Sequence, residues 1–334
     1  MLIREELENA EKERLSPYAT LSVNSKGRMK EEEPCDIRPV FSRDRDRIVH
    51  SKAFRRLKDK TQVFLNPEGD HYRTRLTHTL EVAQIARTIA RALKMNEELV
   101  EAIALGHDLG HTPFGHAGER ALNEVCPLGF RHNEQSVRVV DVLERDGEGL
   151  NLTMEVRDGM EKHKMSSNPA TPEGRIVRLS DKLAYIHHDM DDAIRARVLT
   201  DRDVPAAIGE VLGYTTKERL DTMIHSIISC SAGSADIRMD EVTERAMVDM
   251  RSFMFERVYQ NPIVKSEETK AETLIKTLYA YYIGHKDELP YEYQKLLAKG
   301  DCIERVCCDY VASMTDHYAI SVYENIYIPK SWHG

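Results

Sequence analysis

No uninterrupted apolar run in this sequence approaches the roughly 18 residues that a membrane helix needs. Residues 1–15, MLIREELENAEKERL, are charged where a signal peptide would be apolar. The six cysteines include no C-x-x-C pair, and Cys307 and Cys308 are adjacent, which does not suit a disulfide framework in a chain of 334 residues. We therefore expect reduced thiols in a soluble, cytoplasmic protein that does not associate with membranes.

Positive charge is scarce relative to negative charge. Lys and Arg number 47 against 56 Asp and Glu, so the formal net charge is −9. This makes the chain a poor candidate for a general nucleic-acid coat, although a local basic pocket for a small polyanion is compatible with it. The stretch 43–60, RDRDRIVHSKAFRRLKDK, concentrates Arg and Lys, and a solvated helix face and a phosphate-binding segment explain it equally well. Residues 29–39 contain two prolines and are expected to form an exposed arm or connector.

Strand-like alternation is rare, and no glycine-rich phosphate loop follows a strand pattern, which excludes the Walker and Rossmann classes. Apolar residues instead recur at three- and four-residue steps through 75–93 and 173–198, which predicts two long helices. Asn96 is predicted to cap a helix over 97–108, and a short strand is expected at 61–65. Further helices are predicted over 134–145, 153–164, 217–230, 240–259, 266–282 and 301–317. The predicted fold class is all-α.

Polar residues interrupt three of these helices at positions that face the expected core. His78 lies in the first, the pair His107–Asp108 ends the second, and Asp181 lies in the third. A lone histidine on an apolar face is usually a hydrogen-bonded core residue, but two histidines with two carboxylates would bury uncompensated charge. A divalent cation offsets that cost, and mixed imidazole and carboxylate ligands suit Mn, Fe, Co, Ni or Zn.

The pattern H…HD…D formed by these residues resembles the ligand pattern of the HD-domain metal-dependent phosphohydrolases. The phrase HDLGHTPFGHAGE (107–119) is more specific and resembles the deoxynucleoside triphosphate triphosphohydrolase branch, the dGTPase group. Four other blocks agree in order, namely FRRLKDKTQVF (54–64), RHNEQSVRVV (131–140), LTMEVRDGMEKH (152–163) and DKLAYIHHD (181–189). The resemblance covers about residues 36–230, and no motif is assigned to the last hundred residues.

The resemblance implies an all-α HD-domain fold with additional C-terminal helices. We expect three consecutive segments, which are a charged N-terminal arm with a basic stretch (1–60), the HD phosphohydrolase domain (61–200) and a C-terminal helical region (201–334). A divalent metal ion is implied, with Mn, Mg, Fe, Co, Ni and Zn all left open. The implied metal ligands are His78, His107, Asp108 and Asp181.

The resemblance also implies a catalytic histidine, His116, and its carboxylate partner, Glu119. Their separation of three residues lets them meet on one helical turn, where the carboxylate fixes the tautomer of the imidazole. The alternative is that these two residues only form a pair at the start of a helix. His187 and His188 are expected to be structural, and no role follows for His163.

Arg75 and Lys182 match phosphate-contacting residues of the family, although both are compatible with ordinary surface cations. Tyr185 and Asp189 follow Asp181 at four-residue steps and so share its helix face. In the family this tyrosine packs on the sugar and this aspartate bonds the 3′-hydroxyl, whereas a core aromatic is the alternative for Tyr185. The remaining candidate substrate contacts are His111, Gln62, His132 and Glu134.

The expected reaction converts a dNTP and water, with dGTP or several dNTPs as substrates, into a deoxynucleoside and inorganic triphosphate. One alternative is another HD phosphohydrolase, acting on nucleoside monophosphates or cyclic nucleotides, and another is a nucleotide sensor without turnover. Relatives form oligomers, often hexamers, so a homo-oligomer is expected, with an allosteric dNTP and single-stranded DNA contacts left open.

Overall fold

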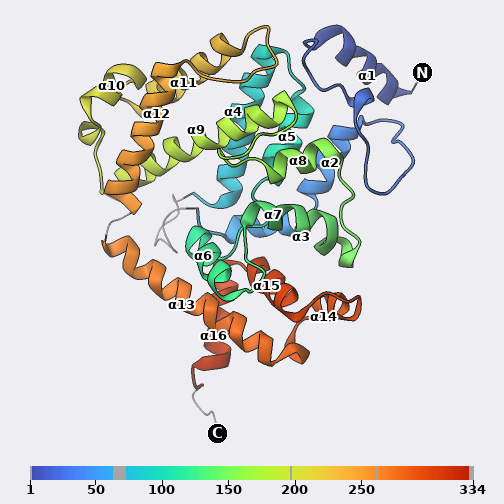
Figure 1. Ribbon diagram of the computed structural model, residues 1–334, viewed down its shortest axis with the longest axis vertical. Coiled ribbons are helices and arrows are strands. Elements are labelled where there is room, and N and C mark those ends of the chain that lie inside the picture. The colour runs from blue at the N-terminus through green and yellow to red at the C-terminus, as the bar shows by residue number, and fades with distance from the viewer. Residues whose placement is uncertain (1, 63–72, 196–197, 260–261, 331–334) are drawn as a thin grey trace. The chain divides into compact units, whose positions relative to one another are not determined.

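The chain folds into helices joined by turns and loops (Figure 1). The computed structural model describes residues 2–62, 73–195, 198–259 and 262–330. Within these ranges no strand forms, and the extended pairing consists of two isolated antiparallel bridges, Arg28 with Thr153 and Thr61 with Thr74. The all-α prediction is therefore confirmed. Of the strand expected at 61–65, Thr61 takes part in a bridge, and residues 63–65 lie outside the described residues.

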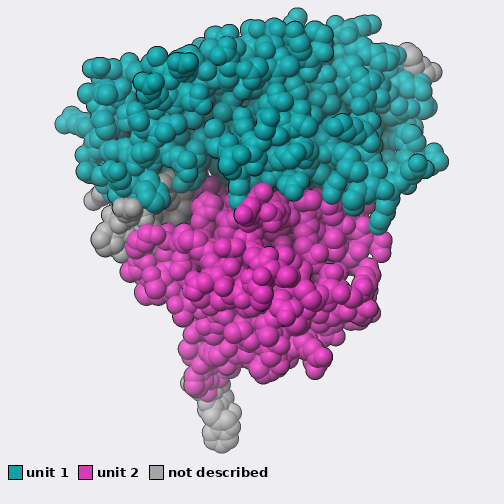
Figure 2. Space-filling model, in the orientation of Figure 1, with its two compact units in different colours: residues 1–50, 77–107, 150–261 teal, residues 51–76, 108–149, 262–334 magenta. Residues whose placement is uncertain are grey.

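The structure divides into two compact units, each assembled from three separate stretches of chain (Figure 2). Unit 1 comprises residues 1–50, 77–107 and 150–261, and unit 2 comprises residues 51–76, 108–149 and 262–334. The predicted division into three consecutive segments stays a prediction. None of the helices in the described ranges is both long and apolar enough to cross a bilayer.

Unit 1 is built around helix α5, which contacts helices on several sides. The helices of unit 1 are α1 (Ile3–Arg14), α2 (Val40–Val49), most of α4 (Arg75–Leu93), α5 (Glu97–Gly106), α8 (Met154–Glu161), α9 (Pro172–Arg195), α10 (Ala206–Leu212), α11 (Thr216–Ser231) and α12 (Glu241–Met254). Asn96 caps α5 as predicted, because its side chain accepts hydrogen bonds from the amides of Glu98 and Leu99. The buried face of α5 packs on α2, α8 and α9, so its C-terminal end is held in a fixed place.

The arginines of α2 are paired with carboxylates of the same unit. Arg45 donates to Glu98 at 2.9 Å, and Arg47 donates to Glu32 at 2.8 Å and to the carbonyl of Leu150 at 2.9 Å. These pairs favour the helix-face interpretation over phosphate binding for this part of the basic stretch. The arm 29–38 is non-helical and largely exposed, as expected.

Unit 2 has a separate core of aliphatic, aromatic and cysteine side chains. Its helices are α3 (Lys52–Arg56), α6 (Gly115–Val125), α7 (His132–Arg138), α13 (Pro262–Gly284), α14 (Tyr291–Ala298), α15 (Ile303–Ser313) and α16 (Asp316–Tyr327). Leu122 of α6 and Ile275 of α13 are fully buried where these two helices pack together. The single helix predicted over 301–317 is wrong, because Met314 is extended and Thr315 caps a new helix by accepting from the amide of Tyr318.

Candidate metal and catalytic site

Two histidines of unit 1 face one carboxylate. His78 lies in the first turn of α4, His107 follows the last residue of α5, and Asp181 lies in the middle of α9. The Nε2 atoms of His78 and His107 lie 3.1 Å and 3.7 Å from Oδ1 of Asp181. Both imidazoles are buried, while the side chain of Asp181 is 26% exposed. Three helices therefore bring together three of the four predicted metal ligands.

The donor set suits a divalent cation. Nδ1 of His107 lies 2.6 Å from the carbonyl of Ala104, so this nitrogen carries a proton and Nε2, which lies toward Asp181, is the atom that would bind a cation. Burial raises the pKa of Asp181, but the hydrogen bond from His78 and the charge of His107 outweigh burial and lower that pKa. The fourth predicted ligand, Asp108, follows His107 directly in the chain.

The remaining predicted residues of α9 continue the face that carries Asp181. Tyr185 is half-buried and Asp189 is fully buried. The ammonium of Lys182 lies 5.0 Å from the centre of the Tyr185 ring. Burial, with the charge of Arg251, lowers the pKa of Lys182. A partly desolvated ammonium beside an aromatic face is suited to binding a phosphate and an adjoining sugar.

Two further histidines stand beside the ligand pair. The ring of His163 lies 5.0 Å from that of His107, and the ring of His188 lies 5.8 Å from that of His78, measured between centroids. Nε2 of His188 lies 3.0 Å from Oε2 of Glu81. The sequence analysis did not predict that His163 lies beside His107, because no regular spacing connects these two positions.

In unit 2, Asp108 is held by a buried arginine. Nη1 of Arg75 donates to Oδ2 of Asp108 at 2.8 Å, and Arg75 is 2% exposed. Nε2 of His111 lies 3.4 Å from the other oxygen of the same carboxylate. Arg75 is therefore no ordinary surface cation, since it orients one of the predicted ligands.

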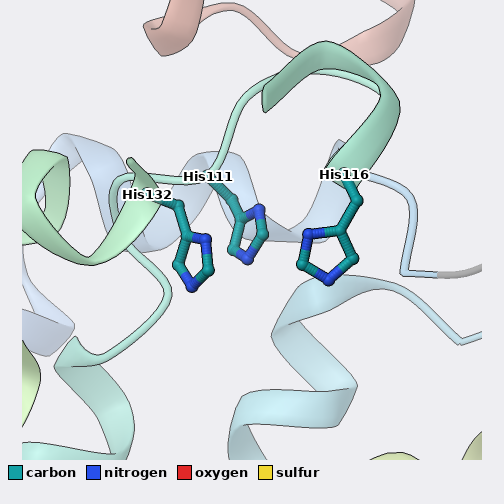
Figure 3. A group of neighbouring side chains, drawn as sticks. All are labelled: His111, His116 and His132. Carbon is teal, nitrogen blue, oxygen red and sulfur yellow. The ribbon is translucent and has the colours of Figure 1, made fainter. Parts of the chain in front are cut away.

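Glu119 is shared by two histidines rather than one. Its Oε2 lies 3.1 Å from Nδ1 of His116 and 2.9 Å from Nδ1 of His132, and its Oε1 accepts the backbone N–H of His132 at 3.0 Å. Ring nitrogens of His111, His116 and His132 lie within 4.8 Å of one another, and the three rings sit side by side (Figure 3). His116 is the exposed member, with 58% of its side chain accessible. The resemblance implied the pair of His116 and Glu119, and their spacing allows it, but neither pointed to the link from Glu119 to His132.

The electrostatics of this cluster favour a charged Glu119 and a neutral His111. Burial raises the pKa of Glu119, but the hydrogen bonds with His116 and His132 outweigh it and lower the pKa below its usual range. Burial, together with the charges of Arg75 and His132, lowers the pKa of His111. The ring of His111 stacks on that of His132, with centroids 3.9 Å apart and planes 14° apart.

The loop before α6 is strained where it approaches Arg75. Phe114 and Gly115 both have positive φ, at 60° and 56°, and a Cβ on Gly115 would lie 2.9 Å from Nη2 of Arg75. Gln62 is half-buried, and its Oε1 has no hydrogen-bond partner among the described residues. The side chain of Glu134, in contrast, is 57% exposed, and its Oε1 lies 3.6 Å from Nη1 of Arg131.

Residues 75–186 of the chain match the model of the HD domain, and residues 237–325 match that of the phosphohydrolase-associated domain. The second match covers a region to which the sequence analysis assigned no motif. A solved structure of a hypothetical protein from Aquifex aeolicus aligns with a TM-score of 0.48 and 19% identity, covering 85% of this chain and 71% of that one. With its helical fold and its His/Asp cluster, the molecule is an HD-domain protein of the phosphohydrolase class.

Relatives of this chain from several organisms carry the name deoxyguanosinetriphosphate triphosphohydrolase-like protein. The one from Caldanaerobacter subterraneus subsp. tengcongensis is 54% identical and aligns over 99% of this chain and 98% of its own length. The one from Desulfatibacillum aliphaticivorans is 49% identical and aligns over 98% of this chain and 99% of its own length. The one from Clostridium perfringens strain 13 is 48% identical and aligns over 99% of both chains. The chain belongs to the family of deoxyguanosinetriphosphate triphosphohydrolase-like proteins.

Proposed function

We propose that this chain hydrolyses a deoxynucleoside triphosphate to a deoxynucleoside and inorganic triphosphate. The observation that carries the proposal is the convergence of His78 and His107 on Asp181, within the segment that matches the HD domain. The name shared by the relatives supports a deoxynucleoside triphosphate, with dGTP first, as the substrate class. Release of intact triphosphate distinguishes this reaction from that of ordinary phosphatases.

A divalent metal ion held by His78, His107, Asp108 and Asp181 would act as a Lewis acid and lower the pKa of a bound water. The chain's own part is to orient these ligands. The hydrogen bond from Arg75 fixes the rotamer of Asp108, and the carbonyl of Ala104 fixes the tautomer of His107. One supporting group is a buried side chain and the other is a backbone carbonyl, so neither is free to move in solvent.

His116 is the residue that we propose to transfer the proton. Because Glu119 accepts the Nδ1–H of this imidazole, Nε2 carries the lone pair and is able to take a proton from attacking water or return one to the leaving 5′-oxygen. The exposure of His116 suits a group that meets substrate, whereas the mostly buried Glu119 suits an orienting group. Arg75 and Lys182 are proposed to stabilise the charge of the triphosphate.

Selection of deoxyribose is assigned to α9. With Asp189 bonding the 3′-hydroxyl and Tyr185 packing on the sugar, a ribose 2′-hydroxyl would collide with the tyrosine ring. His111 and His132 stand next to the catalytic pair and are proposed to contact substrate, as is the buried Oε1 of Gln62. Glu134 has the weakest support, since its carboxylate is exposed beside Arg131.

The test is product analysis by ion exchange after incubating the Mn²⁺-loaded protein with each dNTP, alone and in pairs. We expect deoxynucleoside and triphosphate in equal amounts. Monophosphate with pyrophosphate, or no turnover with any dNTP, would refute the proposal. Preference for dGMP or cyclic GMP over dGTP would indicate a different HD phosphohydrolase, and strong dNTP-dependent thermal stabilisation without product would indicate a sensor.

Two variants separate ligand from proton-transfer residue. Asp108→Ala is expected to lose both metal and turnover. His116→Ala is expected to keep its metal while turnover falls by roughly 10²–10⁴, the usual contribution of a positioned acid or base. Loss of metal from His116→Ala, measured as metal per chain by elemental analysis, would show that these roles are misassigned.

We further propose a cytoplasmic homo-oligomer, with a hexamer as the first size to test by light scattering. Activation by a second dNTP would appear as turnover of one dNTP only in the presence of another. Single-stranded DNA contacts are tested by electrophoretic mobility shift.

A further inference from the structure

The turn that leads into α6 has a backbone conformation that residues other than glycine rarely adopt. Phe114, the last residue before this helix, has a φ of 60° and a ψ of 24°, which lie in the left-handed region. His116 is the second residue of α6, so the direction of its side chain depends on this turn (Figure 3). A strained turn persists only where the surrounding structure holds it.

A carboxylate from a distant part of the chain contacts this turn. Oδ1 of Asp316, in the first turn of α16, accepts the backbone N–H of Phe114 at 3.0 Å. Its other oxygen, Oδ2, accepts the backbone N–H of Thr61 at 3.0 Å and also the hydroxyl of Thr61. Asp316 is 3% exposed, so these bonds form away from bulk solvent. One buried carboxylate therefore joins two segments that are far apart in the sequence.

The segment at Thr61 is itself tied to the start of α4. Thr61 forms an isolated antiparallel bridge with Thr74. The backbone N–H of the next residue, Arg75, donates to the carbonyl of Lys60 at 3.0 Å. The turn before α6 lies close to Arg75 as well, since a Cβ added at Gly115 would lie 2.9 Å from Nη2 of that arginine. Asp316 thus connects the segment that is paired with Arg75 to the turn that precedes His116.

Two other side chains hold the same loop at different points. The hydroxyl of Thr112 donates to the carbonyl of Gly115 at 2.8 Å, and the ammonium of Lys60 donates to the carbonyl of His111. Neither bond involves the backbone of Phe114. The left-handed residue itself is held by the bond to Asp316 and by the burial of its ring in the core of unit 2.

We propose that Asp316 is a positioning residue for His116. By holding the N–H of Phe114 and the segment at Thr61, it fixes the turn from which α6 begins, and with it the direction of the His116 imidazole. Asp316 lies within residues 237–325, the region that matches the phosphohydrolase-associated domain, so that region takes part in arranging the catalytic loop. The inference rests on the proposed role of His116 in the reaction.

The main test is Asp316→Asn, which keeps the shape of the side chain and replaces one accepting oxygen with an NH₂ group. At least one of the backbone N–H groups of Thr61 and Phe114 then faces another donor. We expect kcat to fall at least about 10-fold, because a small displacement of a group that takes part in the reaction is costly. Asp240→Asn is the matched control and should keep the wild-type kcat, because Asp240 also accepts two backbone N–H groups and one hydroxyl but belongs to unit 1.

The same substitution in a His116→Ala background separates positioning from a general loss of stability. If Asp316 acts through His116, Asp316→Asn should cause no further fall in kcat once the imidazole is absent. An equal fall in both backgrounds would overturn the proposal. A wild-type kcat for Asp316→Asn, or an equal fall in Asp240→Asn, would overturn it as well.

Amide hydrogen exchange, followed by mass spectrometry, gives a readout that needs no turnover. Asp316→Asn should exchange at least about 10-fold faster than the wild type in the peptide 111–119, because the turn loses a hydrogen bond to a charged group, whereas Asp240→Asn should not. Unchanged exchange in this peptide would overturn the proposal. If circular dichroism shows that Asp316→Asn is unfolded, Asp316→Glu carries the test with the same expectations, since it keeps both oxygens and displaces them by one methylene. Absence of triphosphate release by the wild type, or an unchanged kcat in His116→Ala, would instead contradict the proposed function.

Discussion

Glu119→Gln keeps the shape of the side chain at the centre of the imidazole cluster and removes its charge. In the wild type, Oε2 faces Nδ1 of both His116 and His132, and Oε1 accepts the backbone N–H of His132. Glutamine offers one accepting oxygen and one NH₂ group, so in either orientation of the amide at least one of these three donors faces another donor. An imidazole that faces the NH₂ group must move its proton from Nδ1 to Nε2, and a protonated Nε2 cannot act as a base.

From this geometry we expect kcat to fall about 10- to 100-fold, as when a group that orients a functional histidine is removed. One unsatisfied buried donor should also lower the free energy of unfolding by about 1–3 kcal/mol. Metal content should stay at the wild-type value, because Glu119 is not among the candidate ligands. His116→Ala, which removes the proton-transfer group itself, should have the larger effect on kcat.

The assay combines the rate of triphosphate release, metal per chain by elemental analysis, and urea unfolding. Glu124→Gln is the matched control, since it makes the same charge change on the same helix at a side chain that is 67% exposed, and it should leave all three values unchanged. A wild-type kcat for Glu119→Gln would refute the orienting role. Loss of metal from that variant would place Glu119 among the ligands instead.

Three stability predictions follow from individual contacts. Asp240 caps α12, and hydrogen bonds from Ser226 and Thr243 lower its pKa to about 2. Asp240→Ala should therefore lower the free energy of unfolding in urea at pH 7 by about 0.5–2 kcal/mol. The difference from the wild type should disappear as the pH falls from the unfolded-state pKa of about 3.9 through 2. Burial lowers the pKa of Lys60 to about 7. Between pH 7 and about 10.4 the unfolded chain therefore holds a proton on this lysine that the folded chain has released. In that window the free energy of unfolding of the wild type should rise with pH relative to that of Lys60→Met. In Gly110→Ala the added Cβ would overlap the backbone nitrogen of Ser136, so the free energy of unfolding should fall by about 1–3 kcal/mol or more. A Cβ added at Gly284 has no neighbouring atom within 4 Å, so Gly284→Ala is the control and should leave the free energy of unfolding unchanged.

The local spacing of apolar residues was sufficient to predict a helix and its ends wherever the helix has one buried face and a clear boundary. The predicted helix over 75–93 matches α4, and the predicted cap at Asn96 is the cap of α5. These features depend on residues three or four positions apart, which the sequence lists side by side. Periodicity also predicted the helices that carry His78 and Asp181, whereas the identification of these residues and His107 as metal ligands came from the resemblance to the HD-domain phosphohydrolases.

Other helix boundaries depended on contacts that periodicity does not encode. Residues 301–317 have a helical apolar pattern, yet the chain extends at Met314 and starts again beyond Thr315. Asp316, the first residue of α16, accepts the amide of Thr61 at 3.0 Å and that of Phe114 at 3.0 Å. These are contacts over 255 and 202 residues, and they favour a break that the local pattern opposes.

The pairings inside the site also came from tertiary structure. The resemblance implied the pair of His116 and Glu119, which a spacing of three residues allows. His132 reaches the same carboxylate from α7, thirteen residues along the chain, and no periodicity joins those two positions. Likewise, the sequence left Arg75 open between a phosphate contact and an ordinary surface cation, and only the fold shows it as a buried partner of Asp108. Residue types and local spacing are written in the sequence, whereas the sharing of one carboxylate or one arginine between distant segments depends on how the helices pack.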